Sequence, residues 1–314
     1  MLRLRRRRSI DSERGSGHVS REAFALSPNP ISLDRWRGRG EWLHHAAGPV
    51  FTRSEGDGPG GALLLIHGFP TASWDWARVW PALTPHFQCH TLDMIGYGLS
   101  TKPRDFAYSV RAQADLIEDF LTARKVCEFA ILAHDFGDTV AQELLARHNE
   151  GSARQQLTKV VFLNGGLFPE THQPLLIQRL LAGPLGQVVA RLGTRQQFAA
   201  NMRKICARPP TNGELDGMWR LMSRENGASV LPKLIGYMAE RRTHRARWVS
   251  ALQDSRVPLR LINGLLDPIS GAHMVARYRE LIANADVVEL KDVGHYPQVE
   301  AADDVARAAL EFLR

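Results

Sequence analysis

The chain has 314 residues, 44% of them hydrophobic and 23% charged, a composition that excludes a wholly disordered, collagen-like or coiled-coil protein. Its formal net charge of +7 raises the question of an anionic partner, such as a nucleic acid or an acidic membrane. Residues 1–40 carry 10 arginines and 4 acidic residues, however, whereas the rest of the chain has 30 basic and 29 acidic side chains. The positive charge therefore belongs to the N-terminal segment, and we expect no nucleic-acid partner.

Residues 1–30 are rich in arginine and contain no apolar core of a secretory signal, so we interpret them as a disordered tail. No stretch of the chain is apolar enough to span a bilayer, because the most apolar one, residues 174–192, is interrupted by polar, glycine and proline residues. Cys89, Cys127 and Cys206 lie too far apart in the sequence to form a zinc motif or a disulfide framework. These features together predict a cytoplasmic protein with no integral membrane segment.

Short apolar runs bounded by turn residues predict the strands in chain order. A hairpin over 37–45 and 49–53 comes first, and the buried strands follow at 61–68, 88–94, 128–134, 159–165, 257–264 and 285–292. Amphipathic stretches between or after them predict helices over 109–124, 139–148, 272–283 and 302–313. The alternation of strands and helices is typical of a mostly parallel, doubly wound α/β sheet.

One long gap interrupts this alternation. Residues 166–247 contain no convincing strand and show helical periodicity broken by proline and glycine. We interpret this segment as a helical cap that divides an α/β core into residues 31–165 and 248–314. Open α/β sheets bind ligands at the carboxyl edge of their strands, so the cap is expected to cover that edge.

The predicted strand 128–134 runs directly into Asp135, and a helix follows at once. This strand–turn–helix pattern is similar to the G-x-S-x-G nucleophile elbow, with Asp135 in the place of the serine. The backbone N–H of Phe136 and the helix N-terminus would face an anion at that position. The alternative is structural, because an aspartate at such a junction often serves only as a helix N-cap.

Two further candidate residues follow later strands. Asp267 comes a few residues after the strand 257–264, and His295 lies in the loop between the last strand and the last helix. Each has a structural alternative, since an aspartate before proline suits a turn and a loop histidine is often a bystander. The order nucleophile, acid, histidine is nevertheless that of an α/β-hydrolase triad.

The strand 61–68 ends in His67-Gly68-Phe69-Pro70. The backbone N–H of Phe69 at this turn would supply the second donor of an oxyanion hole, beside the N–H of Phe136. The segments HGFP, LDMIGYGLSTKP, LAHDFGD, LINGLLDP and VGHYPQVE together resemble the epoxide hydrolase and haloalkane dehalogenase branch of the α/β-hydrolase superfamily, over residues 31–314. AHDFGDTVAQELLAR and FLNGGLFPETHQPLLIQRLL are more similar still to the mesoderm-specific transcript family. The resemblance implies an α/β-hydrolase fold with a cap.

An aspartate nucleophile indicates a particular chemistry. When a carboxylate attacks a saturated carbon, it forms an alkyl ester that water can cleave, whereas a serine would form a nearly inert ether. Asp135 therefore predicts displacement at an epoxide carbon or a carbon–halogen bond. His295 would activate the water and Asp267 would orient the imidazole, with no metal or organic cofactor.

The resemblance also separates these two chemistries. Haloalkane dehalogenases hold the halide with side-chain N–H donors at the positions of Phe69 and Phe136, and neither phenylalanine can donate. Epoxide hydrolases supply tyrosine hydroxyls from the cap, and Tyr237 matches the second of these while the first is absent. A structural role for Tyr237 on an apolar helix face is the alternative.

The remaining candidates concern the substrate. His67, Trp74 and His134 are candidate substrate contacts, with burial in the core as the alternative for Trp74 and packing behind the elbow for His134. We expect a small, mostly apolar substrate that reacts with water, most consistent with hydrolysis of an epoxide to a diol. The alternatives are haloalkane or haloacid dehalogenation with the same triad, and a catalytically idle binding protein on the same scaffold. The absent first tyrosine of the cap and Asp138, three residues after Asp135, favour the last alternative, whereas the complete triad speaks against it. We interpret Asp138 as a structural carboxylate in the first turn of the helix, the alternative being that a second carboxylate disfavours ionisation of the pair.

Overall fold

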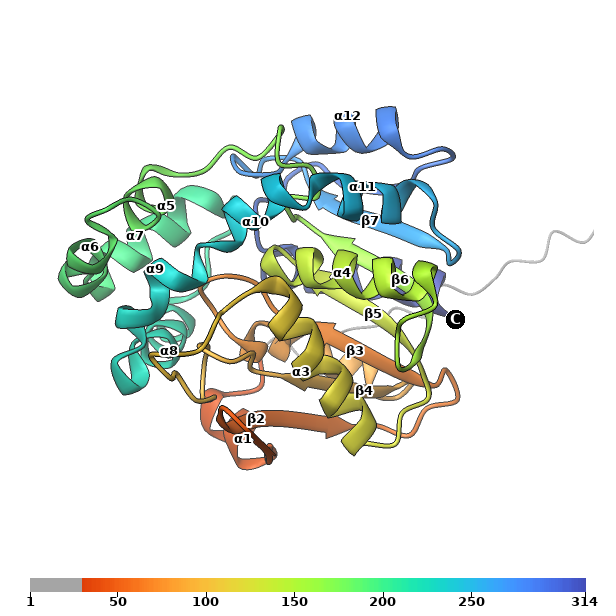
Figure 1. Cartoon of the computed structure of the whole chain (residues 1–314), viewed down its shortest axis with the longest axis horizontal. Coiled ribbons are helices and arrows are strands. Elements are labelled where there is room, and N and C mark those ends of the chain that lie inside the picture. The colour runs from red at the N-terminus through yellow and green to blue at the C-terminus, as the bar shows by residue number, and fades with distance from the viewer. Residues whose placement is uncertain (1–29) are drawn as a thin grey trace, which may run out of the picture.

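The computed structural model describes residues 30–314, so all but the last residue of the predicted tail lies outside the described residues. These residues form one eight-stranded sheet in the order β1-β2-β4-β3-β5-β6-β7-β8 (Figure 1). β1 pairs antiparallel with β2 and β2 with β4, whereas all pairs from β4 to β8 are parallel. The strands are β1 (Glu41–His45), β2 (Gly48–Glu55), β3 (Ala62–Ile66), β4 (Gln88–Leu92), β5 (Glu128–His134), β6 (Gln156–Leu163), β7 (Leu259–Gly264) and β8 (Asp286–Leu290).

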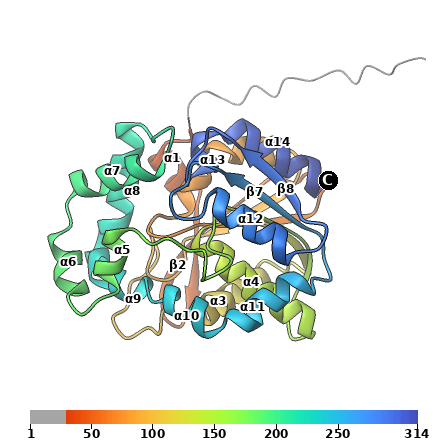
Figure 2. The same ribbon diagram turned by 90° about the horizontal axis from the view of Figure 1, so that it is seen from above.

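Helices cover both faces of the sheet, which is why its central strands are continuously apolar. In β3, for example, Leu63, Leu64 and Leu65 are all completely buried. α3 (Val110–Ala123), α4 (Phe136–Glu150) and α11 (Arg245–Gln253) lie on one face (Figure 1), and α14 (Ala302–Leu313) lies on the other (Figure 2). α2 (Trp80–Leu83) packs against α14. The predicted doubly wound α/β architecture is confirmed.

Shorter helices complete the core. They are α1 (Leu33–Gly38), the 3-10 helix η1 (Ser73–Arg78), α12 (Ala272–Leu281) and α13 (Pro297–Glu300). Within residues 30–314, no helix has the length and apolar character required to cross a bilayer.

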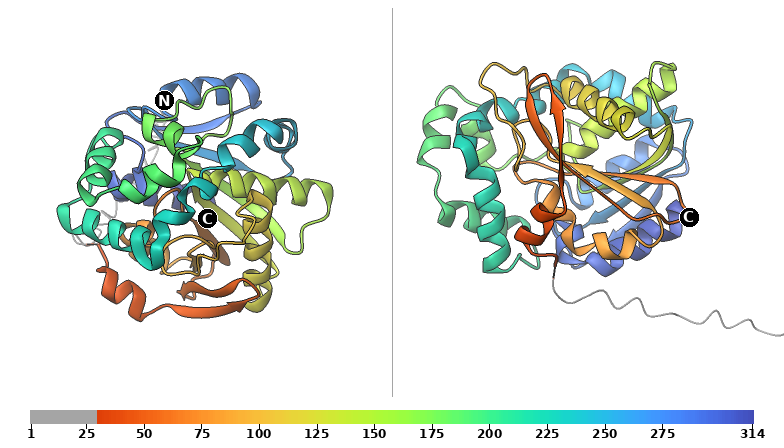
Figure 3. Two further views of the ribbon diagram at one scale, coloured as in Figure 1. Left: turned by 60° about the vertical axis from the view of Figure 1, so that its left-hand side comes forward. Right: turned by 90° about the horizontal axis from the view of Figure 1, so that it is seen from below.

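The regular secondary structure between β6 and β7 is all helical, without a strand in residues 164–258, all of which the structure describes. Helices α5–α10 form a separate mass at one end of the sheet (Figure 3), and we call them the cap. They are α5 (Leu176–Leu181), α6 (Gly186–Leu192), α7 (Arg195–Ile205), α8 (Asn212–Ser223), α9 (Leu231–Leu234) and α10 (Tyr237–Thr243), with the 3-10 helix η2 (Arg224–Val230) after α8.

The boundary expected at residue 247 falls inside α11. This helix packs along α4 of the core, where the Trp248 indole donates a hydrogen bond to the Glu143 carboxylate at 2.8 Å. By packing, α11 therefore belongs with the core rather than with the cap.

Candidate active site

Asp135 occupies the sharp turn between β5 and α4. Its backbone has φ +49° and ψ −106°, a combination that a residue with a side chain rarely adopts and that costs free energy. The turn brings the start of α4 close to β3, since a Cβ added at Gly137 would lie 2.4 Å from the Ile66 carbonyl oxygen. A glycine is therefore required two residues after Asp135, and the aspartate projects from a strained elbow.

The Asp135 carboxylate lies against the turn that follows β3. The backbone N–H of Phe69 donates a hydrogen bond to Asp135 Oδ2 at 3.0 Å. A Cβ added at Gly68 would approach the Asp135 Cβ to 2.9 Å, so a glycine permits this contact. Phe136 is the first residue of α4, and the carboxylate is almost completely buried. Both backbone positions predicted for an oxyanion hole thus border Asp135.

Asp267 and His295 form a buried pair at the carboxyl ends of β7 and β8. Asp267 Oδ2 lies 2.8 Å from His295 Nδ1 and also accepts hydrogen bonds from Asn164 Nδ2 at 3.0 Å and Ser270 Oγ at 2.7 Å. Asp267 Oδ1 accepts from the N–H of Ile269 at 2.7 Å. Burial raises the pKa of Asp267, but the charge of His295 and these hydrogen bonds outweigh it and lower the pKa to about 2. Asp267 is therefore a fixed anion.

His295 carries the opposite shift. Burial lowers its pKa, whereas the charge and hydrogen bond of Asp267 and the charge of Asp135 raise it, with a net rise to about 9. His134 contacts the backbone of His295, because its Nε2 lies 2.8 Å from the His295 carbonyl oxygen. Burial and the His295 charge lower the pKa of His134 to about 4, so His134 is neutral and Nε2 carries its proton.

Arg241 of the cap reaches Asp135, which sequence reasoning missed. Its Nη2 donates to the Asp135 carbonyl oxygen at 3.1 Å and lies 3.8 Å from Oδ1, while its Nε donates to Thr139 Oγ1 at 2.7 Å. The guanidinium is only 2% exposed. In the sequence, Arg241 is one of five basic residues within 241–247 and looks like part of a solvated helix face.

A second carboxyl group lies in the same cluster. Asp138 is completely buried, and burial together with the nearby Asp135 charge raises its pKa well above the usual range. It is therefore a neutral acid, and the Asp135 anion and the Arg241 cation balance each other. His172 lies beside Arg241 and is also neutral, because burial and the Arg241 charge lower its pKa to about 3. Neither of its ring nitrogens has a hydrogen-bond partner among the described residues.

Tyr237, the first residue of α10, lies over the elbow. Its ring centroid is 4.8 Å from that of Phe136 and 5.9 Å from that of Phe69, and the Arg241 guanidinium lies 4.6 Å above the ring. Burial and the Asp135 charge raise the pKa of the Tyr237 phenol, so the phenol stays protonated. Within residues 30–314 its hydroxyl has no hydrogen-bond partner, which leaves a buried donor free on a ring that packs against Phe69 and Phe136.

A cavity of about 600 Å³ opens between the cap and the core. On the core side it reaches Phe69, Pro70, Ile269 and His295, and most of its remaining wall is aliphatic and comes from the cap. It therefore offers an apolar space that ends at the turn after β3 and at His295.

The comparison with known proteins decides the family. A model of the alpha/beta hydrolase fold matches residues 61–302. The chain belongs to the α/β-hydrolase family. It is 40% identical over 284 residues to the LipZ protein of Mycobacterium tuberculosis, which is named as a hydrolase, with 90% of this chain and 98% of LipZ covered. The mesoderm-specific transcript protein of Mus musculus is 35% identical over 300 residues, with 92% of this chain and 89% of that protein covered.

Solved structures agree on the α/β-hydrolase fold. A haloalkane dehalogenase variant from Bradyrhizobium elkanii has a TM-score of 0.72 at 22% identity, covering 87% of this chain and 96% of its own. The epoxide hydrolase CorEH has a TM-score of 0.72 at 16% identity, covering 87% and 97%. At these identities the likeness shows the fold, and the sequence relatives show that the chain is an α/β-hydrolase enzyme.

The expected substrate contacts of this hydrolase need correction. His67, Trp74 and His134 are absent from the lining of the 600 Å³ cavity, and so are Asp135 and Tyr237, so the hydrogen bonds of the three residues rather than the lining decide their roles. His67 Nε2 accepts a hydrogen bond from the N–H of Met94 at 3.0 Å, and His134 holds the His295 loop from behind. These hydrogen bonds to backbone groups of neighbouring loops favour structural roles for His67 and His134, although His134 Nδ1 has no hydrogen-bond partner among the described residues.

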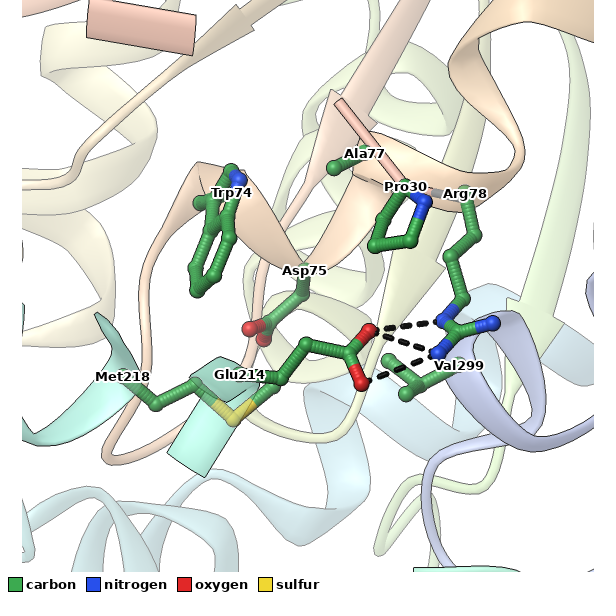
Figure 4. Close-up of a pocket in the computed structure, with 8 residues that line it drawn as sticks. All are labelled: Pro30, Trp74, Asp75, Ala77, Arg78, Glu214, Met218 and Val299. Atoms are coloured by element: carbon green, nitrogen blue, oxygen red, sulfur yellow. Dashed lines mark hydrogen bonds and ion pairs between the residues drawn. The ribbon is translucent and has the colours of Figure 1, made fainter. Parts of the chain in front are cut away.

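Trp74 lies at a second, much smaller pocket of about 10 Å³ (Figure 4). Its indole N–H donates to the Ile31 carbonyl oxygen at 2.8 Å. The same pocket contains a two-bond ion pair, in which Arg78 donates to both carboxylate oxygens of Glu214 at 2.8 and 2.9 Å. This pocket is a packing defect at the junction of η1 and α8, too small for a substrate.

Proposed function

We propose that this hydrolase opens epoxides to diols through a covalent alkyl-enzyme ester on Asp135, with His295 as the base and Asp267 as the residue that orients it. The observation that carries the proposal is the chemistry of the elbow residue. A carboxylate stands where a serine would serve acyl transfer, and it accepts the Phe69 N–H at 3.0 Å. A carboxylate in that position favours attack on a saturated carbon, because the resulting ester remains cleavable.

In the first step, Asp135 attacks an epoxide carbon and the ring C–O bond breaks. Oδ2 is held by the Phe69 N–H, which leaves Oδ1 as the attacking atom. The alkoxide that leaves stays tethered to the substrate and takes a proton, for which the free and protonated hydroxyl of Tyr237 is the available donor. The product of this step is a hydroxyalkyl ester of Asp135.

In the second step, water attacks the Asp135 carbonyl carbon while His295 Nε2 removes its proton. Negative charge then develops on Oδ2, where the backbone N–H groups of Phe69 and Phe136 stabilise it. The Asp267 anion stabilises the imidazolium, whose Nδ1 lies 2.8 Å away. Collapse of the intermediate breaks the bond between the Asp135 carbonyl carbon and Oδ1, the oxygen that attacked the epoxide. The imidazolium gives its proton to Oδ1, which leaves as a hydroxyl of the diol, and the proton of the new Asp135 carboxyl group restores the Tyr237 phenol.

Dehalogenation is the second candidate, and one observation favours it. The cavity wall includes the Trp219 indole and the Asn201 amide, which are N–H donors of the kind that a halide requires. Both come from the cap rather than from the positions of Phe69 and Phe136 beside the nucleophile. Epoxide opening, in which Tyr237 protonates the alkoxide, therefore fits the residues near Asp135 better than dehalogenation does.

The test is a panel of aliphatic epoxides and bromoalkanes assayed for diol and bromide. We expect diol from the wild type, a loss of at least about a thousandfold in Asp135→Asn, and a loss of about 10- to 100-fold in Tyr237→Phe, which keeps the ring. Release of bromide without formation of diol would contradict epoxide hydrolysis and support dehalogenation. Equal ligand binding by wild type and Asp135→Asn, with no turnover of either class, would support an idle binding protein instead.

A further inference from the structure

The outer surface of the cap carries a concentration of exposed apolar side chains. Helices α5 and α6 lie at the left-hand extreme of the molecule in Figure 1, far from the sheet. Five large hydrophobic residues in and between them are 44% to 71% exposed, and only two others in residues 30–314 are comparably exposed. We call these five the cap apolar face: Leu176, Leu180, Leu185, Val188 and Leu192.

This face is continuous with the cavity. Leu176, Leu180 and Leu192 belong both to the exposed face and to the cavity wall, whereas Leu185 and Val188 belong to the face alone. An apolar path therefore runs from the outer surface of the cap to the cavity that ends at Phe69 and His295. Exposed apolar area of this kind is normally a contact surface.

The charged residues on α5 and α6, and on the chain immediately before and after them, have one sign. Residues 171–213 contain six arginines and lysines and no aspartate or glutamate. Arg195 is paired with Asp216, but Arg179 and Arg191, on α5 and α6 themselves, are exposed and have no carboxylate partner within residues 30–314. A short amphipathic surface with cations beside leucines is the combination that favours anionic lipid headgroups above an apolar layer.

We propose that the cap apolar face docks on an anionic lipid bilayer, and that apolar substrates pass from the bilayer along this face into the cavity. A second copy of the chain fits less well, because a symmetric dimer through this face would bring like-charged arginines of the two copies together. Docking is peripheral, since the leucines reach only into the headgroup boundary. The docking surface is independent of the reaction proposed above.

The experiment is flotation of the full chain with vesicles of phosphatidylcholine, with and without phosphatidylglycerol. We expect the wild type to float with phosphatidylglycerol vesicles and the double variant Leu185→Gln/Val188→Gln to bind them about tenfold more weakly, because two apolar side chains no longer leave water. Trp42→Gln removes an exposed aromatic from β1, outside the cap, and should bind like the wild type. Arg179→Gln/Arg191→Gln should reduce the preference for phosphatidylglycerol.

The N-terminal arginines are present in all these proteins, so the differences among them report on the cap. Equal flotation of wild type and Leu185→Gln/Val188→Gln, or flotation of neither, would overturn the proposal. A wild-type dimer that becomes monomeric in that double variant, without vesicle binding, would assign the face to a second copy instead. Flotation requires no turnover, so its result is separate from that of the substrate panel, and a water-soluble substrate should be turned over equally by the double variant.

Discussion

At the scale of single residues, the charge on Asp135 controls its neighbours. As an anion it raises the pKa values of Asp138, Tyr237 and His295, and it faces Arg241, whose Nη2 lies 3.8 Å from Oδ1. Formation of an ester would remove that charge. The pKa of His295 would then fall below its resting value of about 9, which frees the base when the second step requires it.

A pH dependence of ester hydrolysis follows from this coupling. Neutral His295 is the active form, so the single-turnover rate of ester hydrolysis should fall about tenfold per pH unit below an inflection that lies under about 9. Asp267→Asn removes the main charge that raises the His295 pKa and should move the inflection to lower pH while it reduces the plateau. A flat profile, or the same inflection in both proteins, would contradict this role of His295.

At the residue scale, sequence reasoning could place residues in space where they directly follow a strand. Asp135, Asp267 and His295 were selected because the carboxyl ends of parallel strands meet at one edge of a sheet, and the structure brings them to that edge. Arg241 was missed because it comes from a helix 106 residues after Asp135, and no local pattern distinguishes it from a surface arginine. Trp74 could not be placed from the sequence, because a tryptophan in a loop after a strand suits a core as well as a pocket.

At the scale of elements, a partly buried ion pair between Arg78 and Glu214 joins the cap to the core, in addition to the contact of Arg241 with Asp135. Arg78 at the end of η1 donates to both oxygens of Glu214 in the first turn of α8 (Figure 4). Burial raises the pKa of Glu214, but hydrogen bonds from Arg78 and Thr211 outweigh it and lower the pKa below its usual value of 4.5. The pair therefore stabilises the folded chain above about that pH and loses its effect as the pH falls through the lowered pKa.

Arg78→Gln should therefore destabilise the protein by about 2 kcal/mol at pH 7, because it leaves the Glu214 charge buried without its cation. The difference from wild type, measured by urea denaturation, should shrink as the pH is lowered through 4.5 and Glu214 becomes protonated. Arg307→Gln breaks an exposed pair with Asp304 and should change stability by less than about 0.5 kcal/mol. An equal loss of stability in Arg78→Gln at pH 7 and well below pH 4.5 would show that the charge of Glu214 does not cause the loss.

Helices and strands could be predicted from the sequence where the periodicity of their own apolar residues reveals them. The apolar run 61–68 contains β3, and the amphipathic stretch 109–124 contains α3, since burial on both faces and burial on one face leave different periodicities. The helical gap after β6 was also visible. Its end was not, because α11 has the same helical periodicity as the cap and only its packing on α4 separates it.

At the scale of the whole molecule, the positive charge and the exposed apolar residues are concentrated in particular regions of the chain. The Arg-rich N-terminal segment accounts for most of the net charge, and the rest of the chain is nearly neutral in sum. Within this nearly neutral part, residues 171–213 contain six arginines and lysines and no acidic residue, and they include the exposed leucines of the cap. An apolar cavity of about 600 Å³ behind such a surface suits an uncharged substrate of low solubility in water.

The central claim is the covalent ester on Asp135, and a single turnover in ¹⁸O-labelled water tests it most directly. With excess enzyme over a reactive epoxide, the account predicts that one ¹⁸O enters the Asp135 carboxylate, detected by mass spectrometry of the peptide that contains it. The diol from this first turnover should carry no label, since its new oxygen comes from Asp135. An unlabelled Asp135 together with a labelled diol would mean that water attacks the substrate directly, and would contradict the account.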